Sequence, residues 1–197
     1  MITEPMAAPW SRVVTRDGVL LRRPAEADAH GVLAVHGDPA VYAYDPHETH
    51  PDLEHSARFL APMIGHWAMH GFGYWSVLVP RPRWPGGVPG AEAADEGRIF
   101  AGLGGIQSHS LRGVPVLNVY LRFAVPAQGR GLARAVLEQA LATAPLVAPG
   151  VDVVVRTRPA NAVTRHVAER AGFVDEGLEP GTADMQLLRH RGVLLGE

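Results

Sequence analysis

Residues 123–134 read Phe-Ala-Val-Pro-Ala-Gln-Gly-Arg-Gly-Leu-Ala-Arg and join the longest strand candidate of the chain to a helix. Two glycines, Gly129 and Gly131, allow the backbone to turn tightly and let a ligand approach it closely. The first N–H groups of the helix point out of this turn, and the helix dipole adds partial positive charge there. Arg130 and Arg134 add full charges. The segment therefore has the physical features of a pyrophosphate-binding turn, and a strand–helix turn without a ligand is the alternative.

Two other phosphate-binding motifs are excluded by the residues around these glycines. A nucleoside triphosphate loop needs Gly-Lys-Ser/Thr, and the chain contains no lysine. A dinucleotide-binding fingerprint needs a third small residue where Arg134 stands, and it belongs near the first strand of a βαβ unit.

Hydrophobic periodicity on both sides of this turn predicts a mixed α/β architecture. Strands are expected at residues 18–23, 74–79, 98–107, 116–125, 151–156, 173–178 and 184–190. Helices are expected at residues 24–36, 52–70, 131–144 and 161–171. This order of elements predicts helices packed on a sheet that is not wholly parallel.

The 197 residues correspond to one domain. We expect residues 1–17 to be a lead-in, residues 18–190 to form the domain and residues 191–197 to be a tail. Within the domain, residues 80–97 are rich in proline and glycine and predict a long surface loop.

Composition excludes several classes of function. The net charge of −2 disfavours a nucleic-acid partner, and the absence of cysteine excludes disulfides, thiolate zinc sites and a cysteine nucleophile. No stretch approaches the length of a membrane span, and no signal peptide is expected at the N-terminus. The ten histidines are scattered, so we expect no metal site. These features favour a cytoplasmic protein that contacts neither membrane nor nucleic acid.

Three motifs resemble those of the GNAT N-acetyltransferases. Gln128, Gly131 and Ala133 match the [Gln/Arg]-x-x-Gly-x-[Gly/Ala] acyl-CoA loop of that superfamily. Asn161-x-x-Thr164, followed by Gly172-Phe173, resembles its second motif. Residues 20–29 and 65–77 resemble the branch that includes ribosomal-protein N-terminal alanine acetyltransferases. The resemblance covers residues 18–190.

The resemblance implies a fold and a donor. The fold is a mixed, mostly antiparallel sheet of about seven strands, splayed at strands 4 and 5 and flanked by about four helices. The backbone of Phe123, Ala124 and Val125 would pair with the amide-rich arm of acetyl-CoA. Asn161 would bond to that arm and Thr164 would lie beside it. The pyrophosphate would lie on the segment formed by Gln128, Gly129, Arg130, Gly131, Leu132, Ala133 and Arg134.

The implied reaction is direct acetyl transfer to a primary amine, with a strand N–H stabilising the oxyanion. The acceptor would be a small molecule or a protein N-terminus, and relatives occur as monomers or homodimers. A non-catalytic acyl-CoA-binding sensor or regulatory module is the alternative function.

Two catalytic positions depart from the family pattern. Where many relatives carry a Glu, this chain has Asn118, which cannot act as a base but can orient water. Where many carry a Tyr after the second motif, it has Ala168. Tyr120 shares a strand face with Asn118 and is the alternative polar group near the thioester.

The acceptor side has three candidate residues. Tyr44 and Asp45 lie in the loop before the second helix, a region that lines the acceptor side in similar proteins. A turn role is as good an interpretation for Asp45, since Pro46 follows it. Trp75 is the third candidate, and core packing is the alternative for this side chain.

Overall fold

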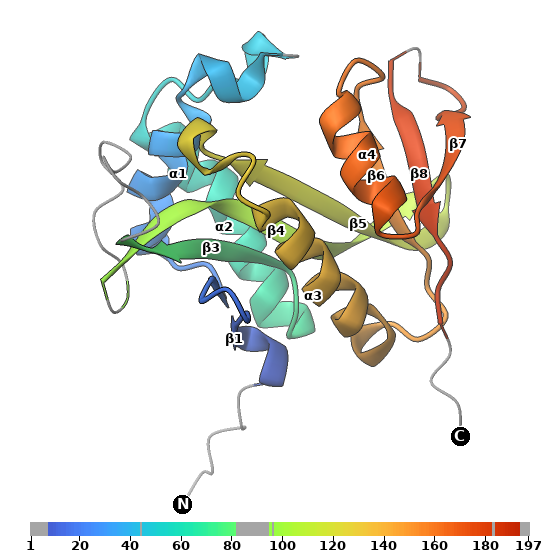
Figure 1. Cartoon of the computed structure of the whole chain (residues 1–197), viewed down its shortest axis with the longest axis horizontal. Coiled ribbons are helices and arrows are strands. Elements are labelled where there is room, and N and C mark those ends of the chain that lie inside the picture. The colour runs from blue at the N-terminus through green and yellow to red at the C-terminus, as the bar shows by residue number, and fades with distance from the viewer. Residues whose placement is uncertain (1–7, 44, 82–94, 96, 183, 194–197) are drawn as a thin grey trace, which may run out of the picture.

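A computed structural model describes residues 8–43, 45–81, 95, 97–182 and 184–193, and all statements below concern these residues (Figure 1). Eight strands form one sheet in the order β1-β2-β3-β4-β5-β6-β8-β7. All neighbouring pairs are antiparallel except β5 and β6, which are parallel. The strands are β1 (Arg12–Val14), β2 (Leu20–Arg22), β3 (Tyr74–Pro80), β4 (Arg98–Leu111), β5 (Val114–Phe123), β6 (Val153–Thr157), β7 (Val174–Leu178) and β8 (Gln186–His190).

Helices cover both faces of the sheet. The described residues contain four α-helices: α1 (Ala29–His36), α2 (Leu53–His70), α3 (Leu132–Val147) and α4 (Ala162–Arg170). In Figure 1, α2 lies behind the central strands, whereas α3 and α4 lie in front of the sheet. Two of the helices begin at side-chain caps, because the carboxylate of Asp52 accepts from the N–H of His55 (2.7 Å) and the amide oxygen of Asn161 accepts from the N–H of Thr164 (3.2 Å).

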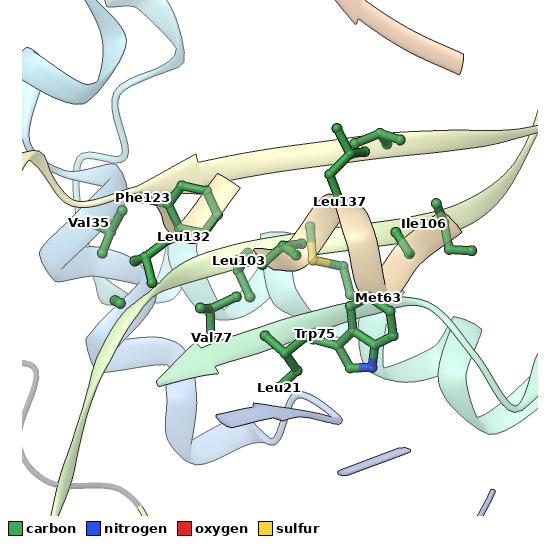
Figure 2. Close-up of a cluster of buried hydrophobic side chains, with 14 of the residues drawn as sticks. Leu21, Val35, Met63, Trp75, Val77, Leu103, Ile106, Phe123, Leu132 and Leu137 are labelled. Carbon is green, nitrogen blue, oxygen red and sulfur yellow. The ribbon is translucent and has the colours of Figure 1, made fainter. Parts of the chain in front are cut away.

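Close approach of helix to sheet depends on small residues. A Cβ atom at Gly31 of α1 would lie 2.5 Å from the ring of Phe100, so only glycine lets this helix lie against β4. On the other face, a Cβ atom at Gly104 would lie 2.9 Å from a methyl group of Val136 in α3. The core therefore extends through both faces of the sheet, as the buried side chains in Figure 2 show.

The predicted architecture is confirmed, with one strand more than expected. Residues 12–14, expected in the lead-in, form β1 and pair with β2 at the edge of the sheet. This short strand escaped prediction because it has no clear alternation and gains its stability from pairing. The expected surface loop at residues 80–97 falls largely outside the described residues.

The sheet opens between β5 and β6, one strand number later than expected because β1 is added. The two strands pair only over Leu117–Val119 and Val153–Val155. Beyond this point β5 continues to Phe123 and β6 to Thr157 without further pairing to each other. The end of β5 therefore exposes backbone groups on its β6 side, and the predicted splay is present.

Candidate functional site

The segment at residues 123–134 leads from β5 through a short 3-10 helix (η6, Val125–Ala127) and a glycine turn into α3. Gly129 and Gly131 have φ angles of +71° and +80°, the left-handed region that other residues avoid. At both positions, the space where a Cβ atom would stand is empty to 4 Å. The turn is therefore both glycine-dependent and open to a ligand.

The N-terminus of α3 leaves several N–H groups without an intrahelical acceptor. Gly131 caps the helix without a side-chain hydrogen bond, and the first helical bond runs from the N–H of Ala135 to Gly131 (3.0 Å). The N–H groups of residues 132–134 therefore point toward the turn with the positive end of the helix dipole. Arg130 folds back to donate to the carbonyl of Pro126 (2.9 Å), and Arg134 pairs with Glu138 at the surface (2.7 Å).

An open cleft of about 370 Å³ lies over this turn. Its walls come from the residues around η3 (Pro39–Tyr42), the end of β5, the turn, and the first half of α4. It brings together most of the predicted donor-site residues: Phe123, Gln128, Gly129, Gly131, Leu132, Ala133, Arg134, Asn161 and Thr164. Leu121, Arg122, Val163 and Val167 also line it, and the motifs do not reveal them.

A smaller hollow of about 110 Å³ lies in the splay itself. We call it the throat. Residues 119–122 of β5 form one wall, residues 155–157 of β6 form the opposite wall, and Asn161 and Thr164 line it as well. Asn161 and Thr164 thus belong to both hollows, which shows that the two hollows adjoin at the start of α4.

The backbone groups that face the throat differ in part from the predicted ones. The N–H of Leu117 donates across to Asp152 near β6, so the alternation of a strand turns the backbone of Leu121 and Phe123 toward β6 as well. The N–H of Ala124 donates to the carbonyl of Ala101 in β4 (3.0 Å). This N–H group is therefore not free to pair with acetyl-CoA, which corrects the expectation for Ala124. The carbonyl of Phe123 accepts from the Gln128 side chain (3.1 Å). The backbone that faces the throat therefore includes Leu121 and ends at the N–H of Phe123. The motif resemblance instead places it at residues 123–125, two residues further along the chain.

Tyr120 lines the throat, whereas Asn118 does not. The amide of Asn118 instead donates to the hydroxyl of Tyr74 (2.8 Å) from the part of β5 that still pairs with β6. The Tyr74 and Tyr120 rings lie 5.3 Å apart. Burial raises the pKa of Tyr120 above its usual value and that of Tyr74 to about 12, so both hydroxyls stay protonated at neutral pH.

A cluster of buried histidines supports the loop that precedes α2. His36 of α1 is fully buried and shares a hydrogen bond with the hydroxyl of Tyr42 (2.8 Å). The side chain of His50, which is 4% exposed, shares a hydrogen bond with Ser56 of α2 (2.9 Å). The backbone N–H of His50 donates to the backbone carbonyl of His36 (2.9 Å). These bonds fasten residues 36–50 between α1 and α2, which places Tyr42 beside β5.

Acid should weaken this cluster, and we expect stability to fall as pH decreases. Burial lowers the pKa of His36 well below its usual value and that of His50 from 6.5 to about 4, with His55 and Arg122 as nearby positive charges. Between pH 6.5 and about 4, His50 is protonated in the unfolded chain but stays neutral in the folded protein. The free energy of unfolding therefore decreases as the pH falls through that range. Urea unfolding at pH 5 and 7.5 measures this difference.

The matched variants for this measurement are His50→Gln and His30→Gln. His30 is an exposed residue of α1, so its replacement should leave the pH dependence unchanged. His50→Gln should reduce it. An equal pH dependence in both variants would contradict the role of His50.

The three acceptor-side candidates have different outcomes. Asp45 forms an ion pair with Arg158, which also pairs with Asp184, so its carboxylate already has a partner. Tyr44 lies outside the described residues. Trp75 is wrong as a substrate-binding residue: it is completely buried, and its indole N–H donates to the carbonyl of Trp10 (2.8 Å). Its neighbour Tyr74 faces β5 residue Tyr120 on the opposite face of the sheet.

Among the described residues, no group of three or more His, Cys, Asp or Glu side chains is arranged to hold a metal ion. No helix in the described part of the chain is long and apolar enough to cross a bilayer.

The sequence profile of the acetyltransferase (GNAT) domain family matches residues 19–174. The chain belongs to the GNAT acetyltransferase family. The matched range includes the β5–α3 turn, the residues that line the throat, and α4. A search of curated proteins finds no matching sequence.

Solved structures share the fold of this GNAT protein at low sequence identity. An acetyltransferase from Agrobacterium tumefaciens str. C58 is 21% identical with a TM-score of 0.65, covering 95% of this chain and 98% of its own. A phosphinothricin acetyltransferase from Sinorhizobium meliloti, in complex with acetyl-CoA, is 16% identical with a TM-score of 0.61, covering 93% and 89%. The microcin C7 self-immunity acetyltransferase MccE, in complex with acetyl-CoA and AMP, is 13% identical with a TM-score of 0.64, covering 94% and 98%.

Proposed function

We propose that this GNAT protein transfers an acetyl group from acetyl-CoA to the nitrogen of a primary amine. The observation that carries the proposal is the junction of two hollows. The cleft over the glycine turn suits a pyrophosphate, and it adjoins a throat with unpaired strand backbone where an amide-rich arm can bind. The acetyl-CoA complexes of two structural neighbours support the choice of donor.

The donor would bind along the path from the turn to the throat. Its pyrophosphate would accept from the N–H groups of residues 132–134, with Arg130 and Arg134 close by. The backbone of Leu121 and Phe123 would pair with its amide-rich arm, and Asn161 and Thr164 would cover that arm from α4. The resemblance to the ribosomal-protein alanine acetyltransferase branch supports an acceptor that is a small amine or a protein N-terminus, and a cytoplasmic location.

The transfer would occur in the throat. The neutral amine nitrogen attacks the thioester carbon, the carbonyl oxygen becomes an oxyanion, and a strand N–H of β5 stabilises it. The carbon–sulfur bond then breaks, and the thiolate takes a proton from the hydroxyl of Tyr120. The proton that the amine loses then returns the Tyr120 phenolate to a hydroxyl. Asn118 and Tyr74 would position Tyr120, because Asn118 donates to the hydroxyl of Tyr74 and the Tyr74 ring packs beside that of Tyr120. Neither residue would touch the substrates.

Tyr120→Phe should therefore lower kcat by about 100-fold or more, in the usual range for the loss of a general acid, with unchanged affinity for acetyl-CoA. The control is Tyr74→Phe, which removes a hydroxyl outside the two hollows and should affect kcat less. Release of CoA thiol with a panel of amines gives kcat, and calorimetry gives the affinity. If Tyr120→Phe turns over as fast as the wild type, Tyr120 is not the acid.

A non-catalytic acyl-CoA-binding module is the second candidate. It is favoured by Ala168, which is 1% exposed and stands where many relatives carry a Tyr that acts as the general acid. The same amine panel decides between the two: saturable acetyl-CoA binding with no thiol release for any amine would establish the binding module.

A further inference from the structure

Two arginines, Arg122 and Arg156, line the throat, and a third, Arg158, directly follows the lining residue Thr157. Two of the three already have carboxylate partners. Arg156 of β6 donates to both oxygens of the buried Glu179 (2.6 and 3.2 Å). Arg158 pairs with Asp45 and Asp184. Arg122 of β5 differs, because no described carboxylate forms an ion pair with it.

Arg122 is nevertheless held firmly in place. Its Nη1 donates to the carbonyl of Val41 (3.0 Å), and its guanidinium carbon lies 4.2 Å from the centre of the Tyr42 ring. Its Nε is buried and has no hydrogen-bond partner among the described residues. The histidine cluster around His36 fixes Tyr42 in turn, so the position of the guanidinium is set before any ligand arrives.

A partly buried guanidinium without a carboxylate partner costs free energy of folding. Removal of a guanidinium from water is normally offset by a carboxylate and by full hydrogen bonding. One carbonyl and two aromatic rings, those of Tyr42 and Tyr120, compensate only part of that loss. Arg122 also lines both the cleft and the throat, one residue from each of the two backbone positions that face the donor. The guanidinium therefore lies close to the place where the acceptor must approach the thioester.

We propose that the acceptor amine carries a carboxylate, as an amino acid does, and that Arg122 binds this carboxylate. The inference rests on the proposed acetyl transfer. The planar guanidinium presents a fork of N–H donors that matches the two oxygens of a carboxylate. Because Arg122 lines the throat, a carboxylate bound to it would keep an adjacent amino group close to the thioester.

The test compares amino acids with their amides. Wild-type protein is assayed for thiol release with the twenty standard L-amino acids, their primary amides and simple alkylamines. We expect kcat/KM for the best amino acid to exceed that of its amide by about 30-fold or more, the usual cost of leaving a buried charge unpaired. Arg122→Met should abolish the preference mainly by raising KM for the acid, and Arg122→Lys should restore part of it.

Two further measurements separate the possible failures. Arg58→Met removes an exposed arginine of α2 and should keep the preference. The affinity of Arg122→Met for acetyl-CoA, measured by calorimetry, should stay within about threefold of wild type, because the donor contacts backbone at this position. A loss of donor affinity as large as the loss of activity would assign Arg122 to the donor and overturn the inference.

The outcomes also distinguish this inference from the function on which it rests. Amides and alkylamines that react as well as amino acids would overturn the role of Arg122 and leave acetyl transfer to amines standing. Thiol release with none of the compounds would overturn both. A preference for amino acids that disappears in Arg122→Met would support both.

Discussion

Gly131→Trp should reduce the affinity for acetyl-CoA by at least about 100-fold, equivalent to about 2.7 kcal/mol of binding free energy. Gly131 begins α3 at a φ of +80°, with nothing within 4 Å of the space where a Cβ atom would stand. An indole in that space would cover the N–H groups on which the pyrophosphate is expected to lie. Calorimetric titration with acetyl-CoA measures the loss.

The matched control is Gly113→Trp in the turn between β4 and β5. Gly113 also has a positive φ, +83°, and nothing within 4 Å of its missing Cβ, but it does not line the cleft. Both variants should show the same kind of backbone strain in thermal unfolding, and only Gly131→Trp should lose the donor. Equal binding by the two variants would show that the turn does not bind the donor.

Trp75→Ala should lower the free energy of unfolding by about 3–5 kcal/mol, the usual cost of removing a large aromatic side chain from a core. Trp75 is completely buried, and a Cβ atom at Gly105 would lie 2.6 Å from its ring, so the surroundings are tightly packed. The variant also removes the indole N–H that donates to Trp10. Urea unfolding monitored by circular dichroism measures the change.

Trp75→Phe is the control, because it keeps an aromatic ring and loses only part of the volume together with the N–H. It should be destabilised less than Trp75→Ala and should keep the wild-type KM for the acceptor. A raised KM with unchanged stability would show instead that Trp75 contacts the acceptor.

Local sequence patterns predict much of the architecture. The α3 turn and the caps at Asp52 and Asn161 depend on short stretches of chain, where one residue's conformational preference or side-chain oxygen determines the backbone. The strands on both sides of the glycine turn are also local, since buried strands contain continuous apolar runs. The edge strand β1 has no such pattern and was missed.

The donor site is less completely predictable than the turn within it. The motif marks Gln128, Gly131 and Ala133, but strand register decides that Leu121 and Phe123 face the splay and that Ala124 bonds to β4. A shift of one residue along a strand reverses which backbone groups are free, and no local preference encodes that choice.

By itself, the sequence determines the kind of molecule: an α/β fold with a glycine-dependent turn between strand and helix, and no cysteine chemistry. These properties follow from residue types at short spacing. Only the tertiary structure decided which charges are already neutralised. Asp45 and Arg158 lie 113 residues apart and form an ion pair, whereas Arg122 contacts Val41 and Tyr42 and pairs with no carboxylate in the described part of the chain. Such pairings depend on distant segments meeting at the splay, because electrostatic interactions act between neighbours in space and not along the chain.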